Sequence, residues 1–514
     1  MTELGRGQTR GRRAAATRAV PRRAAPGRTG PPRNLNRLPI VIAVAAAIAV
    51  AVVLESGDPD QAATAPASAD RVPTIPSADA LSVSWYCAEG TATVGGRADE
   101  TILVANIGDE EAEAVVTALT GGDGRAPRER VQVPARGQVE VQLADLTETE
   151  EELAPNATLL GPGVVVEAFG GQVIVEHLIT RGGDLAMGPC SRTASPEWYF
   201  AGGTTVRGTE MMLALFNPFG DDAIVDITYL TDTGVQTPEG AQAVVVPRKS
   251  RVAVLVHEQV RRQPEVATLV RARTGRVVAE QSLAFDGSEG PLGLTLSLGT
   301  TAPAHSWALP FGTMGEGRTH TVAVANFTDT GTEVEVSMLL DGDETVEPEV
   351  VPVAGRSVAS VDVGTLVPVG TPYAVDVRVT GNAPVVAEEL LTSVAASEGG
   401  AALEFGVPGP ARRWAFAGAG ETGDSTAADA VISVLNPSRD PVTVTLLAYT
   451  SGDLDLPRRP PERAVDPGGR TSFNLAELGI GSDQVLVVQA DGPVFAERLL
   501  LTATGRSLAP GIRG

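Results

Sequence analysis

The sequence predicts an all-β protein of four tandem β-sandwich modules that follow an N-terminal transmembrane helix. Three observations support this prediction. A single tryptophan recurs at near-constant spacing, short runs alternate between apolar and polar residues, and one uncharged apolar stretch precedes the repeats. Period-2 alternation bounded by Gly, Asp, Asn and Pro is typical of strands joined by turns.

The N-terminal region divides the chain into two parts of opposite charge. Residues 1–37 hold ten arginines and one acid, for a net charge of +9; the whole chain carries −23, so the remainder carries −32. We interpret residues 1–37 as a basic disordered arm on the cytoplasmic side. The acidic remainder would repel nucleic acid, so no nucleic-acid partner is expected.

Residues 38–54 read LPIVIAVAAAIAVAVVL, with arginines before them and acids after them. Seventeen uncharged residues meet the lower length limit for a membrane-spanning helix. The positive-inside rule then predicts a single-pass signal anchor in the cell membrane, with the C-terminal region extracytoplasmic. A cleaved signal peptide, with small-residue sites near residues 65–69, and a buried globular helix are the alternatives. Residues 55–80, rich in Asp, Ala, Pro and Ser, are predicted to be a flexible linker.

The modules are defined by recurring landmarks in constant order. We place module 1 at residues 81–192, module 2 at 193–302, module 3 at 303–410 and module 4 at 411–514. Each module has one tryptophan in its predicted core, one strand ending in asparagine, and one later strand carrying a glutamate. The tryptophans are Trp85, Trp198, Trp307 and Trp414, the asparagines are Asn106, Asn217, Asn326 and Asn436, and the glutamates are Glu176, Glu280, Glu388 and Glu497.

A strand containing proline lies between the asparagine and the glutamate, as in Val133-Pro134 and Val351-Pro352. About 105 residues with room for roughly seven short strands match the size of an immunoglobulin-like sandwich, whereas a propeller blade needs only about 40–45. Asparagine can bond its own backbone two residues further on, so we expect it to end one strand and start a hairpin.

The two cysteines, Cys87 and Cys190, bracket module 1. Positions equivalent to Cys87 are Phe200, Leu309 and Phe416, which indicates a residue facing the core. Outside the cytoplasm such a pair is expected to form a disulfide, with free thiols or an intermolecular bridge as alternatives.

No pattern in the sequence predicts catalysis, a cofactor or a metal site. His177 falls in no metal-ligand spacing, and the GxGxxG letters at 418–423 precede a predicted strand where a dinucleotide site needs a helix. The four glutamates are expected to lie tens of ångströms apart, as strand-edge or turn-facing charges that can pair with a local arginine such as Arg498. The acidic stretch 341–344 is interpreted as a solvated hairpin tip.

The WYF and AGG opening, the LALFNP strand and the VVAE strand resemble an uncharacterised actinobacterial family of membrane-anchored or exported proteins, a domain of unknown function with tandem immunoglobulin-like modules. The resemblance covers residues 81–514. It implies no activity and transfers no catalytic residue.

We therefore expect a non-enzymatic cell-envelope protein that acts as an extracytoplasmic structural or protein-interaction scaffold. The alternative is an array that binds cell-wall polysaccharide. In that case Tyr86 and Tyr199, next to the first two tryptophans, are the candidate sugar-facing residues, because sugar binding favours exposed aromatic side chains.

Overall fold

The computed structural model describes residues 72–92, 97–121, 126–147, 161–341, 345–394, 399–419, 429–450, 460–481, 483–502 and 505–514. The basic arm and the predicted membrane segment 38–54 lie outside these ranges. No helix within them is long and apolar enough to cross a membrane. All the described residues belong to one compact unit, Pro66–Gly514.

Modules 1 and 2 consist of short strands with a single helical turn or two between them. Module 1 contains β1 (Ser82–Cys87), β2 (Asp99–Asn106), β3 (Ala112–Leu119), β4 (Arg128–Val133), β5 (Gly137–Gln142), α2 (Leu143–Thr147), β6 (Gly163–Phe169), β7 (Val173–Arg181) and β8 (Asp184–Pro189). Module 2 contains β9 (Glu197–Phe200), β10 (Thr209–Asn217), β11 (Ala223–Thr231), β12 (Gly234–Gln236), η3 (Glu239–Ala241), β13 (Val244–Val246), β14 (Ser250–Leu255), α3 (Val256–Gln259), β15 (Val266–Thr274), β16 (Val278–Asp286) and β17 (Leu292–Leu298).

Modules 3 and 4 repeat this succession. Module 3 contains β18 (Ser306–Leu309), β19 (Arg318–Asn326), β20 (Thr332–Leu340), β21 (Glu349–Val353), β22 (Ser357–Asp362), η4 (Val363–Thr365), β23 (Tyr373–Val379), β24 (Val386–Ser393) and β25 (Gly400–Phe405). Module 4 contains β26 (Ala411–Phe416), β27 (Asp429–Leu435), β28 (Val442–Tyr449), β29 (Glu462–Val465), β30 (Arg470–Asn474), α4 (Leu475–Leu478), β31 (Val485–Leu501), β32 (Arg506–Pro510) and β33 (Ile512–Arg513).

Each module is built from two antiparallel sheets with the same strand order. In module 1 the orders are β1-β6-β3-β4 and β5-β2-β7-β8, and module 3 repeats them as β18-β23-β20-β21 and β22-β19-β24-β25. In module 4 the long strand β31 pairs in both sheets. The predicted all-β, sandwich-like repeats are therefore confirmed. The strand order differs from the A-B-E-D and C-F-G sheets of an immunoglobulin domain, a connectivity that one sequence could not reveal.

The four tryptophans lie in the module cores, with at most 2% of their surface exposed. The Trp198, Trp307 and Trp414 indole nitrogens each donate a hydrogen bond to the carbonyl three residues before the module glutamate, at 2.7–2.9 Å. These bonds connect the first strand of a module to the strand that carries its glutamate.

Each landmark asparagine organises a hairpin turn. Asn217 accepts a hydrogen bond from the Phe219 N–H at 3.0 Å and donates to the carbonyls of Asp221 and Val246 at 2.8 and 3.0 Å. Asn106, Asn326 and Asn436 make the corresponding bonds. In module 3 the valine that accepts this bond is Val353, which ends β21, the strand that contains Pro352.

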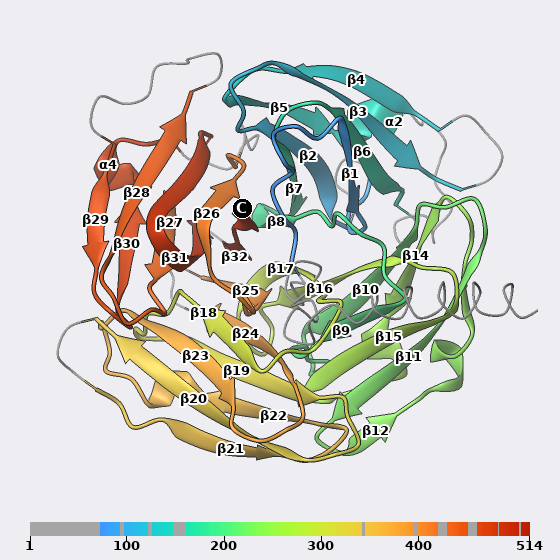
Figure 1. Ribbon diagram of the computed structural model, residues 1–514. Coiled ribbons are helices and arrows are strands. Elements are labelled where there is room, and N and C mark those ends of the chain that lie inside the picture. Colours follow the sequence, from blue (N-terminus) through green and yellow to red (C-terminus); the bar gives the residue numbers. More distant parts are fainter. Residues whose placement is uncertain are drawn as a thin grey trace, which may run out of the picture. The chain divides into compact units, whose positions relative to one another are not determined.

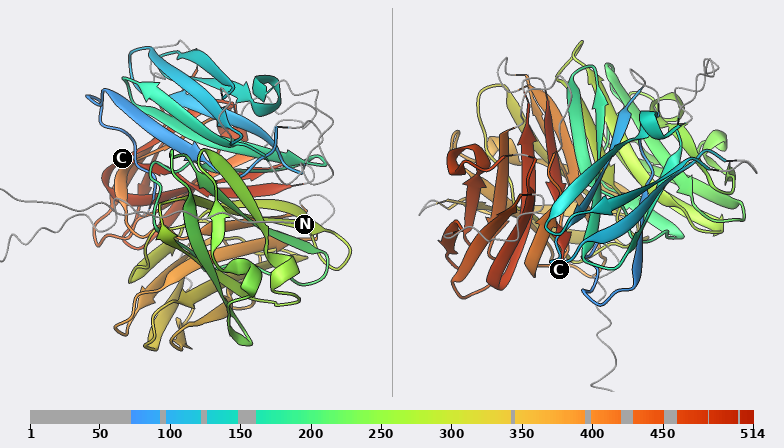
Figure 2. Two further views of the ribbon diagram at one scale, coloured as in Figure 1. Left: turned by 90° about the vertical axis from the view of Figure 1, so that its right-hand side faces the viewer. Right: turned by 90° about the horizontal axis from the view of Figure 1, so that it is seen from above.

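The modules follow one another around a common centre and the last contacts the first (Figure 1). Their final strands, β8, β17, β25 and β32, lie against one another. One apolar core cluster is shared mainly by modules 1 and 4, and another by modules 2 and 3. Seen from two further sides, the strands of module 1 again lie beside those of module 4 (Figure 2). The unit is thus a closed arrangement of four modules.

Residues 72–76, which the sequence assigns to the flexible linker, are ordered against the end of the chain. Thr74 pairs with Arg513, the Ile75 N–H donates to the Arg513 carbonyl at 2.6 Å, and Val72 is 5% exposed. This part of the linker prediction is wrong because the composition of the segment gives no sign of the strand that it meets.

Candidate functional site: the polar interfaces between modules

The four recurring glutamates join the modules. Each is at most 1% exposed and accepts hydrogen bonds from backbone N–H groups of another module. Glu280 accepts from Ala88 and Glu89, Glu388 from Gly202, Glu497 from Phe311, and Glu176 from Ala417. The donors lie three or four residues after the tryptophan of their module. The glutamate of each module thus bonds the backbone of the preceding module, and the glutamate of module 1 bonds the backbone of module 4.

This arrangement corrects the sequence-based expectation for the glutamates. They are not strand-edge charges in solvent, and they are not all far apart, because Glu388 and Glu497 both act electrostatically on Glu404. Arg498 pairs with Glu176 of module 1 instead of its neighbour Glu497. The sequence shows that the glutamates recur, but it does not show that the four modules form a closed arrangement. That arrangement places each glutamate side chain against another module.

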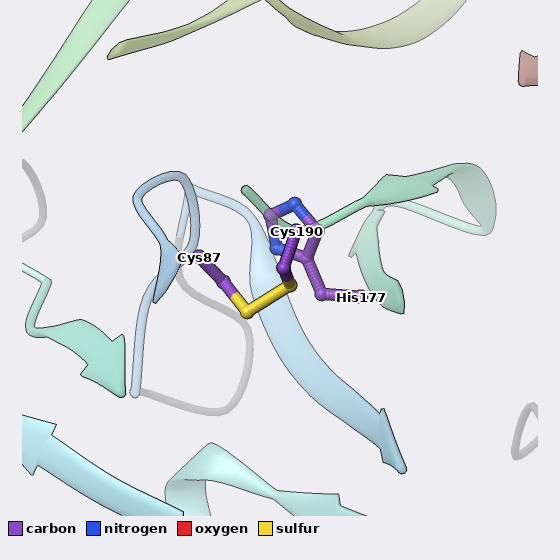
Figure 3. A group of neighbouring side chains, drawn as sticks. All are labelled: Cys87, His177 and Cys190. Atoms are coloured by element: carbon purple, nitrogen blue, oxygen red, sulfur yellow. A yellow bond between two sulfur atoms is a disulfide. The ribbon is translucent and has the colours of Figure 1, made fainter. Parts of the chain in front are cut away.

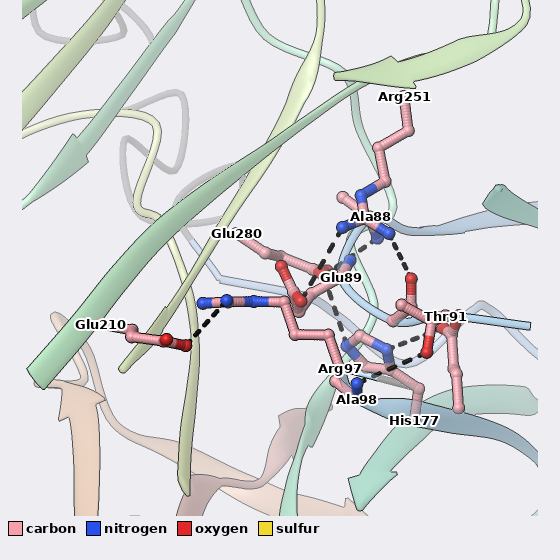
Figure 4. Close-up of polar contacts among 11 residues, drawn as sticks. Ala88, Glu89, Thr91, Arg97, Ala98, His177, Glu210, Arg251 and Glu280 are labelled. Atoms are coloured by element: carbon pink, nitrogen blue, oxygen red, sulfur yellow. Dashed lines mark hydrogen bonds and ion pairs between the residues drawn. The ribbon is translucent and has the colours of Figure 1, made fainter. Parts of the chain in front are cut away.

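The interface of modules 1 and 2 carries a buried cluster of mixed charge (Figure 4). His177 Nδ1 lies 3.0 Å from Glu100 Oε1, and His177 Nε2 lies 3.4 Å from Glu280 Oε2. Burial lowers the pKa of His177, but the carboxylates of Glu280 and Glu100 outweigh it and raise the pKa to about 9. Burial raises the pKa of Glu280 to about 7. Arg251 supplies a second positive charge, 3.9 Å from Glu89.

The interface of modules 3 and 4 is acidic. Glu389 lies close enough to Glu497 to raise the pKa of its carboxyl group, and Glu404 lies within electrostatic reach of both. Burial raises the pKa of all three carboxyl groups well above the usual range, which favours their protonated forms. His320 Nε2 lies 2.7 Å from Glu389 Oε2 but without the alignment of a hydrogen bond. Burial lowers the pKa of His320 to about 3, so the ring is neutral.

The predicted disulfide between Cys87 and Cys190 is confirmed, with a Cα–Cα distance of 4.8 Å (Figure 3). His177 lies beside it, and ligand-type atoms of these three residues are within 4.8 Å of one another. Because the two sulfur atoms are bonded to each other, the oxidised group offers no thiolate ligands for a metal. Among the described residues no other group of histidine, cysteine and acidic side chains has the spacing of a metal site.

The two tyrosines named as sugar-facing candidates lie near module boundaries. Tyr199 is 7% exposed, and its hydroxyl donates to Glu197 at 2.6 Å while its ring packs edge-on against Phe327 of module 3. Tyr86 is partly buried against the core shared by modules 2 and 3. A sugar-binding platform needs an exposed ring face, and the packing of Tyr199 disfavours that role.

Two other predictions from the sequence fall largely outside the described residues. Most of the GxGxxG letters lie in residues 420–428, outside the described residues. Residues 342–344 of the acidic stretch also lie outside them. Asp341 is described, and it pairs with Arg470 of module 4 at 2.9 Å. It therefore contributes to an interface between modules.

The fold and its interfaces define a class: an all-β protein of sandwich-like repeats joined by recurring buried glutamates that accept hydrogen bonds from a neighbouring repeat. A family model described as "Family of unknown function (DUF5719)" matches residues 180–419, from the end of module 1 to the start of module 4. This is consistent with the expected uncharacterised domain. No curated protein matches the chain.

Similar solved structures include two that match about one module. A Thermotoga maritima 1070 structure is 18% identical over 20% of this chain and 93% of that chain, with a TM-score of 0.19. The Anabaena sensory rhodopsin transducer is 25% identical over 17% and 88%, with a TM-score of 0.15. A tetra-tandem repeat from a large adhesion protein is 13% identical over 84% and 99%, with a TM-score of 0.10. At these TM-scores the similarities support no assignment of function.

Proposed function

We propose that the protein is a non-enzymatic, membrane-anchored scaffold of the cell envelope, held in the membrane by residues 38–54 and presenting the four-module unit to extracytoplasmic protein partners. The observation that supports this is the cyclic use of the recurring glutamates. Because these carboxyl groups are buried and bonded to the backbone of another module, they join the modules and are not available to a substrate.

Partners would meet the outermost strands of the module sheets. Val245 lies on β13 and Val350 on β21, and each of these strands is at the edge of its sheet. The two side chains are 50% and 54% exposed. Edge strands present unpaired backbone groups, and an extended segment of another protein can add to them. Two such edges on successive modules would give one partner two points of attachment.

The test uses the full chain in intact cells, with a photoreactive residue placed at Val245 or at Val350. A matched control carries the same residue at Val369, which is 78% exposed but lies in a turn. We expect the same protein to be crosslinked from both edge positions and not from the turn. The scaffold proposal fails if no protein is captured from either edge, or if a protease cannot reach a tag placed after Gly514 in intact cells.

Binding of cell-wall polysaccharide is the second candidate, and one observation favours it. A surface pocket of about 530 Å³ lies between modules 1 and 4 and is lined by polar groups that include Gln138, Glu140, Asp483 and Gln484. Such side chains can bond sugar hydroxyl groups. Co-sedimentation of the full chain with isolated wall polysaccharide, lost on Glu140→Ala but kept on Tyr199→Phe, would support this function in place of the scaffold.

A further inference from the structure

A pocket of about 400 Å³ opens where modules 1 and 2 meet. It is bordered by the start of β8, the start of β10, the end of β16 and the start of β17. Its lining includes three acidic side chains, Asp184, Glu210 and Asp286, and an apolar wall formed by Phe285, Leu292 and Leu294. This volume is within the range of small-molecule sites, which is about 300–1,000 Å³.

Asp184 breaks the symmetry of the four modules. Strand pairing places Pro189, Leu298, Phe405 and Pro510 opposite the four glutamates. Five residues before each of these are Asp184, Gly293, Gly400 and Gly505. Three modules therefore have no side chain at this position, and module 1 has a carboxyl group. An added Cβ on Gly505 would overlap Asp184 Oδ1, so the aspartate occupies space that glycine leaves open.

The Asp184 carboxyl group has one satisfied and one unsatisfied oxygen. Oδ1 accepts a hydrogen bond from the Leu185 N–H at 2.8 Å, and the nearby Leu294 N–H of module 2 lowers the pKa of the carboxyl group. Oδ2 has no partner among the described residues, although the residue is only 5% exposed. Burial raises the pKa of this carboxyl group to about 7. A buried acceptor without a donor destabilises the folded chain, and a donor supplied by a ligand would remove that cost.

The remaining charges in the pocket favour a cation. Glu210 is already paired, with Arg97 at 2.8 Å and Arg181 at 3.0 Å, both from module 1. Asp286 accepts from the Ser288 N–H at 2.8 Å and stays exposed to solvent. Three acids and the guanidinium group of Arg181 line the pocket, and Arg97 pairs with Glu210 from outside the lining, so one negative charge remains in excess of the two arginines. Leu292, 55% exposed, forms an apolar border with the nearly buried Phe285.

We propose that this pocket binds an organic cation, a protonated primary amine on a short apolar stem, with the ammonium group against Asp184 Oδ2 and the stem against Phe285 and Leu292. The ammonium group supplies the donor that Oδ2 lacks, and the stem covers the apolar wall. A neutral alcohol of the same shape supplies a weaker donor, and a carboxylate would meet like charge. This ligand site goes beyond the scaffold function and does not depend on it.

The test is calorimetric titration of the full chain in detergent at pH 7.5 with phenethylamine, 2-phenylethanol and 3-phenylpropionate. We expect phenethylamine to bind at least tenfold more tightly than the alcohol, and the carboxylate not to bind. Asp184→Asn keeps the shape and removes the charge, so it is expected to weaken amine binding at least tenfold. Asp232→Asn, in the exposed β11–β12 turn, makes the same change in net charge and should leave binding unchanged.

Asp184→Gly provides a second variant in case Asn disturbs the fold, because glycine is the residue of the other three modules. It should remove amine binding while thermal unfolding stays cooperative. The proposal is overturned if wild type does not bind the amine, if the alcohol binds equally well, or if both Asp184 variants bind the amine as wild type does.

Discussion

Arg498 of β31 forms a two-point ion pair with Glu176 of β7, and this pair joins the last module to the first. Its Nη2 lies 3.1 Å from Glu176 Oε1 and its Nη1 lies 3.2 Å from Oε2. Nη1 also donates to the Ala417 carbonyl at 2.6 Å. Both side chains are at most 2% exposed. Residues at the same position in modules 1, 2 and 3 are His177, Gln281 and Glu389, so each interface has its own chemistry.

Replacing Arg498 by methionine is therefore expected to destabilise the unit. Glu176 would remain buried with its negative charge unpaired, and breaking a buried pair by removing one partner costs about 3–5 kcal/mol. Adding Glu176→Gln removes that charge, so the double variant should recover most of the lost free energy of unfolding. Urea denaturation of the full chain in detergent measures both. Equal stability of the single and double variants would contradict a structural role for the pair.

Stability is expected to fall as the pH rises from 6 to 9. Burial raises the pKa of Glu280 to about 7 and that of Glu388 to about 8, and neighbouring carboxylates raise that of His177 to about 9. In each case the folded state binds a proton more tightly than the unfolded chain, so the stabilisation is present at low pH and is lost as the pH passes the folded pKa. One pKa unit corresponds to about 1.4 kcal/mol, so the loss should reach several kcal/mol.

His320 acts in the opposite direction at the acidic end. Because burial lowers its pKa to about 3, the unfolded chain takes up a proton near pH 6.5 that the folded chain does not, and its contribution to stability falls as the pH decreases below that value. Glu280 and Glu388 lose their stabilisation from about pH 4.5 upward and together outweigh His320 above that pH, so the thermal midpoint should be highest near pH 4.5. Glu389→Gln, which imitates the protonated carboxyl group, should raise the midpoint at pH 9 and change it little at pH 6. A midpoint independent of pH would be inconsistent with these buried groups.

Sequence periodicity predicts the strands, the tryptophan cores and the asparagine turns because these depend on neighbours within one module. Asn217, for example, bonds residues two and four positions further along the chain and Val246, which ends β13. The role of Glu388 depends on Gly202, a residue 186 positions away in another module. A pattern of neighbouring residues cannot predict a contact between residues so far apart in the sequence. The recurrence of the glutamates could therefore be predicted, but their hydrogen-bond partners could not.

The residues equivalent to the two cysteines in other modules form a second pattern in the sequence. Cys87 corresponds to Phe200 and Phe416, and Cys190 corresponds to Gly299 and Gly511. An added Cβ on Gly299 would lie 2.6 Å from Phe200 Cζ, and one on Gly511 would lie 2.8 Å from Phe416 Cζ. In modules 2 and 4 an aromatic ring packs on a glycine where module 1 has its disulfide.

Cys87→Phe with Cys190→Gly should therefore give module 1 the packing of modules 2 and 4. Removing the cross-link by Cys87→Ala with Cys190→Ala is expected to cost about 4–5 kcal/mol, the loop-closure value for roughly 100 residues. The Phe and Gly pair should recover part of that loss by filling the space, and should make the unfolding midpoint insensitive to reductant. If both double variants unfold at the same denaturant concentration, the aromatic and glycine pairing does not substitute for the disulfide.

The tryptophans offer a comparison between two modules of the same chain. Trp198 donates to the Val277 carbonyl at 2.7 Å, whereas the Trp85 indole nitrogen has no partner among the described residues. Replacement by phenylalanine removes a similar volume at both sites, but only Trp198→Phe removes an indole hydrogen bond; the Val277 carbonyl then keeps the Ser195 N–H donor at 2.9 Å. We expect Trp198→Phe to lower the free energy of unfolding by about 0.5–1.5 kcal/mol more than Trp85→Phe, the net contribution of one hydrogen bond. Denaturant unfolding of the two variants at pH 6 measures the difference, and a larger loss for Trp85→Phe would show that the indole hydrogen bond does not decide the stability of the modules.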